Sequence, residues 1–333
     1  MSGRAFDEIL ARYPSWVQPR SLLESLGGAG GQSGARLWRY GSEHGLLVLR
    51  AWPADGPGRK HLEQVHDWLF KLAELGFIPV PIRDRAGRSL QDYEGRLWEI
   101  APWLAGTAAV ANPPGAVRLC AVFAGLAAVH DQLGREQLEA VSPGLRRRYE
   151  AVTQLVQGGF DVLEATIQRQ AEFRAEQAEV ARRWLSLARV LAPLLLDPLM
   201  RASALECRLQ PCLRDARPEH FLFDGDRLSG LVDFGAMGVD SVAGDLARLI
   251  GEWLEGEKRA RGEALAAYEG IRPLQPAETD LIGVFESSAD LLIGERWLRW
   301  HYLENRRFED SQAVSNGLAR GLKRLERLAL ELT

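Results

Sequence analysis

The feature that most constrains this chain is a short segment, residues 212–235, with an aspartate on either side of a turn. The segment reads CLRDARPEHFLFDGDRLSGLVDFG. Its Asp224-Gly225 pair lies between two apolar runs, which is a strong local signal for a β-hairpin. Such a hairpin can bring Asp215 and Asp233, which flank its two strands, to the same edge. We therefore expect both carboxylates to face one cleft.

Two carboxylates at one edge suit phosphoryl transfer. One can accept or orient the proton of the attacking hydroxyl, while the other holds Mg²⁺ against the phosphates. Mg²⁺ is a hard ion that prefers oxygen ligands, so a carboxylate is an appropriate partner for it. The segment therefore predicts a site that handles a polyphosphate and its cation.

The first 100 residues have the order of a small lobe that covers a nucleotide. A glycine cluster, LGGAGGQSG, precedes two short apolar runs, ARLWRY and LLVLRAW, that are typical of strands. Residues 61–75 carry Leu62, Val65 and Leu69 at helical spacing, and Pro79 ends that pattern. Residues 84–90 and 95–100 then predict a further pair of strands.

The rest of the chain predicts a hinge and a helical lobe. Residues 101–109, APWLAGTAA, contain the Pro102 and Gly106 that suit a hinge, and residues 110–333 are mostly amphipathic helix around the hairpin of 212–235. The expected fold class is α+β with two lobes, a small N-terminal β-sheet lobe (1–100) and a larger helical C-terminal lobe.

These motifs resemble the aminoglycoside phosphotransferases and their relatives, among them the choline, homoserine and fructosamine kinases. The likeness rests on Asp215, the hairpin, and the sequel DFGAMGVDSVAGDLARL that begins at Asp233. The helix GLAAVHDQL upstream is also similar to an apolar helix of that family. The resemblance covers roughly residues 20–305 and implies a protein-kinase-like fold.

The resemblance also implies a role for individual residues. Asp215 matches the catalytic base and Asp233 the magnesium ligand. Backbone N–H groups of the glycine loop would approach the nucleotide phosphates, and Arg50 stands where the family has a phosphate-binding lysine. Glu63 is the candidate acidic partner of Arg50. The loop glycines are Gly27, Gly28, Gly30, Gly31 and Gly34, and the adenine-binding hinge would run over Glu99, Ala101 and Trp103.

Three positions depart from the family pattern. Leu213 and Arg214 replace the usual His-Gly before the base, and Arg50 replaces lysine. His220 stands where the family has an asparagine metal ligand, so it could bind a softer ion such as Mn²⁺, leave a single metal bound, or hydrogen-bond Asp215. Arginine can still grip phosphate through its planar fork.

The composition narrows the classes of partner that this protein could bind. The net charge of −4 and the lack of long charge runs argue against nucleic acid as a partner. Three unpaired cysteines and an N-terminus without a signal-peptide core predict a cytoplasmic protein. The apolar stretch from Trp184 to Met200 is interrupted by Arg189, Pro193 and Asp197, so we expect a buried helix and no membrane span.

The leading hypothesis is ATP-dependent phosphorylation of a hydroxyl on a small molecule that is aminoglycoside-, amino-alcohol- or sugar-like, with Mg²⁺ or Mn²⁺. A cationic acceptor could bind among a group of aromatic and acidic residues, although core packing is the default for Trp297 and Trp300, which lie three residues apart on one helix face. The group comprises Trp253, Trp297, Trp300, His301, Tyr302, Glu252 and Glu295. One alternative, motivated by His220 and Arg50, is a catalytically silent pseudokinase that acts as a nucleotide-binding regulatory module. Another is a kinase for proteins or for lipopolysaccharide sugars.

Overall fold

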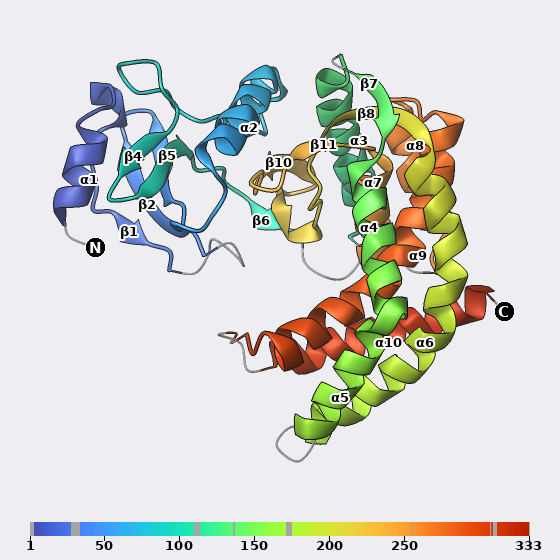
Figure 1. The fold of residues 1–333 in the computed structure, drawn as a ribbon. Helices are drawn as coiled ribbons and strands as arrows, with labels where there is room; N and C mark the ends of the chain where they lie inside the picture. The colour runs from blue at the N-terminus through green and yellow to red at the C-terminus, as the bar shows by residue number, and fades with distance from the viewer. Residues whose placement is uncertain are drawn as a thin grey trace. The chain divides into compact units, whose positions relative to one another are not determined.

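The computed structural model describes residues 3–27, 34–109, 114–135, 137–170, 175–254, 256–306, 308 and 312–332 (Figure 1). Two compact units make up the chain. The first comprises Met1–Glu136, Pro211–Gly238 and Glu252–Pro273, and the second comprises Gln137–Gln210, Val239–Gly251 and Leu274–Thr333. The segment with the two aspartates therefore belongs to the same unit as the N-terminal sheet. The lobe boundaries expected from the sequence stay a prediction.

The first unit is built on an antiparallel sheet in the order β1-β2-β3-β5-β4. Its strands are β1 (Glu24–Ser25), β2 (Arg36–Ser42), β3 (Gly45–Ala51), β4 (Gln91–Tyr93) and β5 (Arg96–Pro102). Trp38 and Trp98 stack with ring centroids 5.7 Å apart, and Ile9 of α1 (Gly3–Leu10) is buried in the same core. The two apolar runs of the sequence are thus β2 and β3, as expected.

Helix α2 (Arg59–Lys71) follows the sheet's third strand and continues into a 3₁₀ turn, Ala73–Leu75. It buries the residues that the helical spacing marks, Leu62, Val65 and Leu69. A polar residue, His66, lies on the same buried face. The predicted helix over 61–75 is therefore present, with its last turn tightened.

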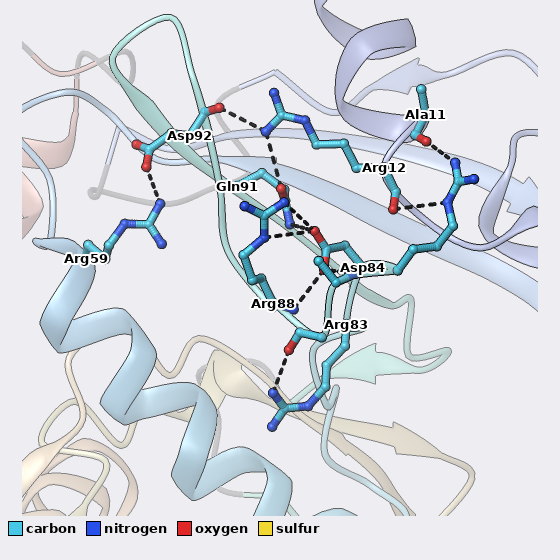
Figure 2. A network of polar contacts seen from close by, with 11 residues as sticks. Ala11, Arg12, Arg59, Arg83, Asp84, Arg88, Gln91 and Asp92 are labelled. Carbon is cyan, nitrogen blue, oxygen red and sulfur yellow. Dashed lines mark hydrogen bonds and ion pairs between the residues drawn. The ribbon is translucent and has the colours of Figure 1, made fainter.

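Residues 84–90 do not form the expected strand. The buried carboxylate of Asp84 accepts hydrogen bonds from the backbone N–H groups of Ala86 (2.9 Å) and Arg88 (2.8 Å), which closes a turn. Figure 2 shows the side chains of Arg88 and Gln91 meeting the same carboxylate. Burial raises the pKa of Asp84, but these hydrogen bonds outweigh it and hold the pKa below its ordinary value. The partner of β5 is instead β4, which begins at Gln91.

The remaining elements of the first unit surround the predicted hairpin. β9 (Phe221–Asp224) and β10 (Arg227–Leu231) pair antiparallel across a two-residue turn in which Gly225 has a φ of +59°. β6 (Thr107–Ala108) joins β9 on its other side. Helix α3 (Ala116–Leu133) packs on α8 (Lys258–Glu269) and on β10. The hairpin expected at Asp224-Gly225 is confirmed.

The second unit is mainly helical. α6 packs against α4, α5, α9 and α10, and α9 packs against α10. A three-stranded sheet, in the order β11-β8-β7, accompanies the helices. The helices are α4 (Pro143–Gln154), α5 (Phe160–Gln170), α6 (Ala175–Ala204), α7 (Ala243–Trp253), α9 (Pro276–Leu298) and α10 (Ala313–Leu332). A kink at Leu155–Gly159, where Gly158 has a φ of +121°, joins α4 to α5, and a π-helical turn at Arg299–Leu303 follows α9. The strands are β7 (Leu138–Val141), β8 (Glu206–Cys212), whose last two residues belong to the first unit, and β11 (Gly238–Asp240), whose first residue does.

Length and composition alone would allow one helix of the described chain to cross a membrane, and this helix is α3. Half of its apolar window is buried inside the protein. The stretch from Trp184 to Met200, which the sequence marks as most apolar, lies within α6 and contributes buried Trp184, Leu195 and Leu199.

A glycine contact fixes how three helices of the second unit pack. A Cβ on Gly294 of α9 would lie 2.0 Å from Nε1 of Trp184 in α6. A Cβ on Gly321 of α10 would lie 2.7 Å from the Cα of Gly294. These backbones can approach each other only because neither residue has a side chain.

We therefore expect Gly294→Ala to lower the free energy of unfolding by about 1–3 kcal/mol, the usual cost of overpacking a core. Gly283→Ala is the matched control, since Gly283 is exposed on the same helix and its Cβ would meet open space. Alanine should stabilise that position by about 0.5–1 kcal/mol. Urea unfolding of both variants checks the pair, and equal stabilities would contradict the packing.

Candidate active site

The register of the small sheet brings together two charged side chains that the sequence keeps far apart. Arg50 of β3 is the cross-strand partner of Glu99 of β5, so both side chains leave the sheet on the same face. Nη1 of Arg50 lies 3.3 Å from Oε1 of Glu99, and the two side chains are 22% and 10% exposed. An ion pair this enclosed is screened far less than one at the surface.

Glu99 has further donors around it. Nε2 of His66 lies 2.8 Å from its Oε2, and Nε1–H of Trp52 donates to the same oxygen at 3.2 Å. The other ring nitrogen of His66 lies 2.8 Å from the hydroxyl of Ser89. Burial raises the pKa of Glu99, but His66 and Arg50 outweigh it and lower the pKa to about 2. Glu99 is therefore an ionised, fully engaged group.

The carboxylate beside Arg50 is thus Glu99 and not the expected Glu63. Glu63 is an exposed residue of α2 whose Oε1 accepts a hydrogen bond from Arg59, one turn earlier, at 3.0 Å. The helix sends His66 toward the sheet instead. The reason is geometric, because directly paired residues of neighbouring strands have adjacent side chains, whereas Glu63 lies on the outer face of α2.

The expected hinge residues lie along the end of β5. Ala101 pairs with Val48, and the N–H of Trp103 donates to the carbonyl of Leu46 at 2.9 Å. That donor is therefore already engaged, and the side chain of Glu99 is committed to Arg50 and His66. Adenine binding by Glu99, Ala101 and Trp103 stays a prediction.

The glycine loop is only partly described. Gly28, Gly30 and Gly31 lie outside the described residues. Gly27 and Gly34, at the two edges of the loop, have φ values of +58° and +71°, a backbone that glycine adopts without a steric penalty. Phosphate binding by this loop stays a prediction.

The segment that carries Asp215 begins where β8 ends. Asp215 follows Arg214, whose φ of +63° is unusual for a residue with a side chain. Oδ1 of Asp215 accepts a hydrogen bond from Nε of Arg217 at 2.8 Å, and the Asp215 side chain is 31% exposed. The ion pair with Asp215 outweighs burial and raises the pKa of Arg217. Asp215 is therefore accessible and held in orientation by its neighbour.

Asp233, on the far side of the hairpin, meets His220. Nε2 of His220 lies 3.5 Å from Oδ2 of Asp233, while the N–H of Val232 donates to the carbonyl of His220 at 2.9 Å. Asp233 also has a left-handed backbone, with φ of +66°. Backbone strain of this kind concentrates at functional sites.

A short chain of contacts links the two aspartates. Arg217, which holds Asp215, accepts the N–H of His220 on its carbonyl at 3.1 Å, and His220 in turn meets Asp233. Both aspartates therefore belong to one local arrangement at the base of the hairpin. The donor set fits a divalent cation in part, because Asp233 offers carboxylate oxygens and His220 a ring nitrogen.

Sequence reasoning missed three residues of this site. Arg217 lies only two positions after Asp215, so its guanidinium could have been considered as a partner of the Asp215 carboxylate. His66 could have been found as a polar residue within the apolar stripe of α2. Trp52 carried no such signal, because a tryptophan that ends an apolar strand usually belongs to the core.

The chain is similar to several solved structures over nearly its whole length. An amicoumacin kinase in complex with AMP-PNP, Ca²⁺ and Ami aligns with a TM-score of 0.66 and 14% identity, over 98% of this chain and 93% of that chain. A microcompartment-associated aminopropanol kinase aligns with a TM-score of 0.61 and 14% identity, over 99% and 98%. A choline/ethanolamine kinase family protein from Mesorhizobium loti gives 0.53 and 18% identity, over 96% and 99%.

This likeness, together with the small antiparallel sheet and the hairpin between Asp215 and Asp233, defines a protein-kinase-like α+β fold. The chain belongs to the family described as "Phosphotransferase enzyme family" (APH), which matches residues 27–278. The fold and the family expected from the sequence are both confirmed.

The chain is also similar to homoserine kinases of two bacteria. A homoserine kinase of Methylorubrum populi is 29% identical over 293 residues, 85% of this chain and 82% of that protein. A homoserine kinase of Brucella anthropi is 28% identical over 231 residues, 66% of this chain and 62% of that protein. The match thus spans less than two thirds of the Brucella protein.

Glu99→Gln tests the buried ion pair, because it keeps the shape of the side chain and removes its charge. The folded pKa of about 2 lies below the ordinary 4.5, so the ionised carboxylate stabilises the fold above pH 4.5. This contribution is lost as the pH falls toward 2. We expect the variant to lose on the order of 3 kcal/mol at pH 7, and the difference from wild type to shrink between pH 4.5 and 2.

Urea unfolding at a series of pH values measures both quantities. Glu63→Gln is the control, since an exposed ion pair within one helix contributes only about 0.3–0.5 kcal/mol. A gap between wild type and Glu99→Gln that stays constant down to pH 3 would count against the ion pair.

Proposed function

We propose that this protein transfers the γ-phosphoryl group of ATP to a hydroxyl group of a small molecule. The observation that carries the proposal is the contact chain from Asp215 through Arg217 and His220 to Asp233, in a chain of the phosphotransferase family. This arrangement offers a base and a metal-binding carboxylate at the two ends of one hairpin. The reaction needs both of these groups and little other protein chemistry.

Each residue has a defined task in this proposal. Asp215 accepts the proton of the acceptor hydroxyl while the hydroxyl oxygen bonds to the γ-phosphorus. The bond from that phosphorus to the bridging oxygen breaks, and ADP leaves. Arg217 keeps the Asp215 carboxylate in orientation. Asp233 and His220 would hold a divalent cation, which supplies positive charge beside the phosphates when bound.

Arg50 would contact the phosphates. A guanidinium carries five N–H donors, so Arg50 can keep its contact with Glu99 and still donate to a phosphate oxygen. Its buried partner fixes the guanidinium before the nucleotide arrives. A phosphate that binds a guanidinium already held in place does not have to immobilise it. Less conformational entropy is lost on binding, which favours affinity.

The acceptor belongs to a class of small hydroxyl compounds that the relatives suggest. Homoserine kinases are among the similar proteins, and an aminopropanol kinase is among the similar folds, so amino alcohols are the first candidates. A cationic subsite at Trp300 and Glu295 has little support. Arg299 already pairs with Glu295 at 2.6 Å, and Arg306 lies 4.7 Å from the centre of the Trp300 ring. The protein's own cations engage both groups.

A nucleotide-binding regulatory module is the second candidate. His220 at the second metal position and Arg50 in place of lysine favour it, because both change how a metal-bound nucleotide would be held. In either case the use of ATP and a cytoplasmic location are part of the proposal. All three cysteines, Cys120, Cys207 and Cys212, are free thiols, which agrees with a reducing compartment.

Asp215→Asn separates the two candidates. Loss of the base should lower kcat by about 10²–10⁴-fold and leave nucleotide affinity nearly unchanged. Release of ADP with homoserine, aminopropanol, choline and aminoglycosides as acceptors measures turnover, and a fluorescent ATP analogue measures binding. Wild-type protein that binds the analogue but matches the variant in turnover would favour the binding module.

His220→Asn tests the cation. An imidazole suits Mn²⁺ better than Mg²⁺, whereas an amide oxygen suits Mg²⁺. We expect the wild type to prefer Mn²⁺ and the variant to shift the ratio of kcat/KM with Mg²⁺ to that with Mn²⁺ upward, by about 10-fold. Initial rates over a range of both metals provide the ratio. An unchanged ratio would place His220 outside the metal shell.

A further inference from the structure

One tryptophan touches both halves of the candidate active site. Trp52 directly follows β3 and is only 3% exposed. Its Nε1–H donates to Glu99, and Cζ of Arg50 lies 5.0 Å from the centre of its ring. The indole therefore contacts the guanidinium of Arg50, which we propose binds the phosphates. It also contacts the Glu99 carboxylate that holds this guanidinium.

The opposite edge of the same indole meets the tripeptide that contains Asp233. A Cβ built on Gly235 would lie 2.8 Å from Cη2 of Trp52 and 3.3 Å from its Cζ3. The ring therefore packs directly on the glycine backbone, where no larger residue fits. Gly235 is only two residues from the candidate metal ligand.

A second residue of the N-terminal part holds the same glycine. Nε2 of His61, in the first turn of α2, lies 2.9 Å from the carbonyl oxygen of Gly235. A carbonyl can only accept, so His61 is the donor in this bond. Gly235 is thus fixed by Trp52 packing on one side and by a hydrogen bond on the other.

These contacts restrict the backbone conformation of Asp233. Its left-handed conformation costs free energy for a residue with a side chain, and such strain persists where surrounding structure over-determines it. Phe234, the residue between, is buried. With Phe234 anchored in the core and Gly235 clamped, the chain has little freedom to relax at Asp233.

We propose that Trp52 is a positioning residue that sets the guanidinium of Arg50 and the carboxylate of Asp233 at a fixed separation, with His61 as its support. The inference rests on the proposed function, since it takes Arg50 as the phosphate contact and Asp233 as the metal ligand. Because one rigid ring contacts both sides, polyphosphate at Arg50 and a cation at Asp233 bind cooperatively. The coupling between the two ligands is the quantity that Trp52 controls.

The experiment measures this coupling without turnover. A fluorescent ATP analogue is titrated with and without Mn²⁺, and the ratio of the two dissociation constants is compared among variants. We expect Trp52→Leu to reduce the ratio by roughly tenfold relative to wild type, within the usual range of coupling between two ligands. Trp52→Phe keeps an aromatic ring beside Arg50, but it loses the donor to Glu99 and its shorter ring withdraws from Gly235, so its ratio should lie between the two.

Trp68→Leu is the matched control. Trp68 is a buried tryptophan of α2, 5% exposed, and its truncation should lower stability without changing the metal ratio. His61→Ala provides an independent arm and should reduce the ratio, while His61→Gln, which can still donate to Gly235, should restore part of it. These histidine variants carry the test if Trp52→Leu fails to fold.

A Trp52→Leu protein that is folded and keeps the wild-type ratio within about twofold would overturn the inference. An equal loss of coupling in Trp68→Leu would also overturn it, because the effect would then be general destabilisation. If the wild type binds the analogue with the expected metal coupling but phosphorylates no acceptor, the proposed function fails and the role of Trp52 stands. Absence of nucleotide binding by the wild type would overturn both.

Discussion

The candidate active site depends on the interactions that the buried carboxylate of Glu99 makes. Removing a carboxylate from water is costly, and three donors offset that cost here: Arg50 and Trp52 at the end of β3, and His66 of α2. The strand register sets Arg50 opposite Glu99, so the ion pair depends on the pairing of β3 with β5. The guanidinium of Arg50, which we propose contacts the phosphates, is thereby held by the core of the sheet and is not a flexible surface group.

The sequence predicted local elements wherever one pattern dominated. The strands β2 and β3, the helix α2 and the hairpin of β9 and β10 all follow from apolar spacing and turn residues. The strand expected at residues 84–90 failed for a physical reason. The buried Asp84 organises its neighbours into a turn through backbone hydrogen bonds, and strand propensity does not include that effect.

Pairing across the fold was harder to predict than the elements themselves. Asp215, His220 and Asp233 could be selected because all three lie in one segment, and the structure links them through Arg217. The partner of Arg50 could not be selected, because the choice between Glu63 and Glu99 depends on the register of β3 with β5. A pattern of apolar residues does not determine that register.

The enclosure of Glu99 also limits how the chain can vary. An aspartate would be too short to reach Arg50 and His66 at once, and a neutral residue would leave a guanidinium in the sheet without its counter-charge. Change at any one of these positions therefore requires compensation at another. Among related chains, positions 50, 66 and 99 should covary as a unit, and that covariation would separate chains with this arrangement from those with a lysine and a helix-borne acid.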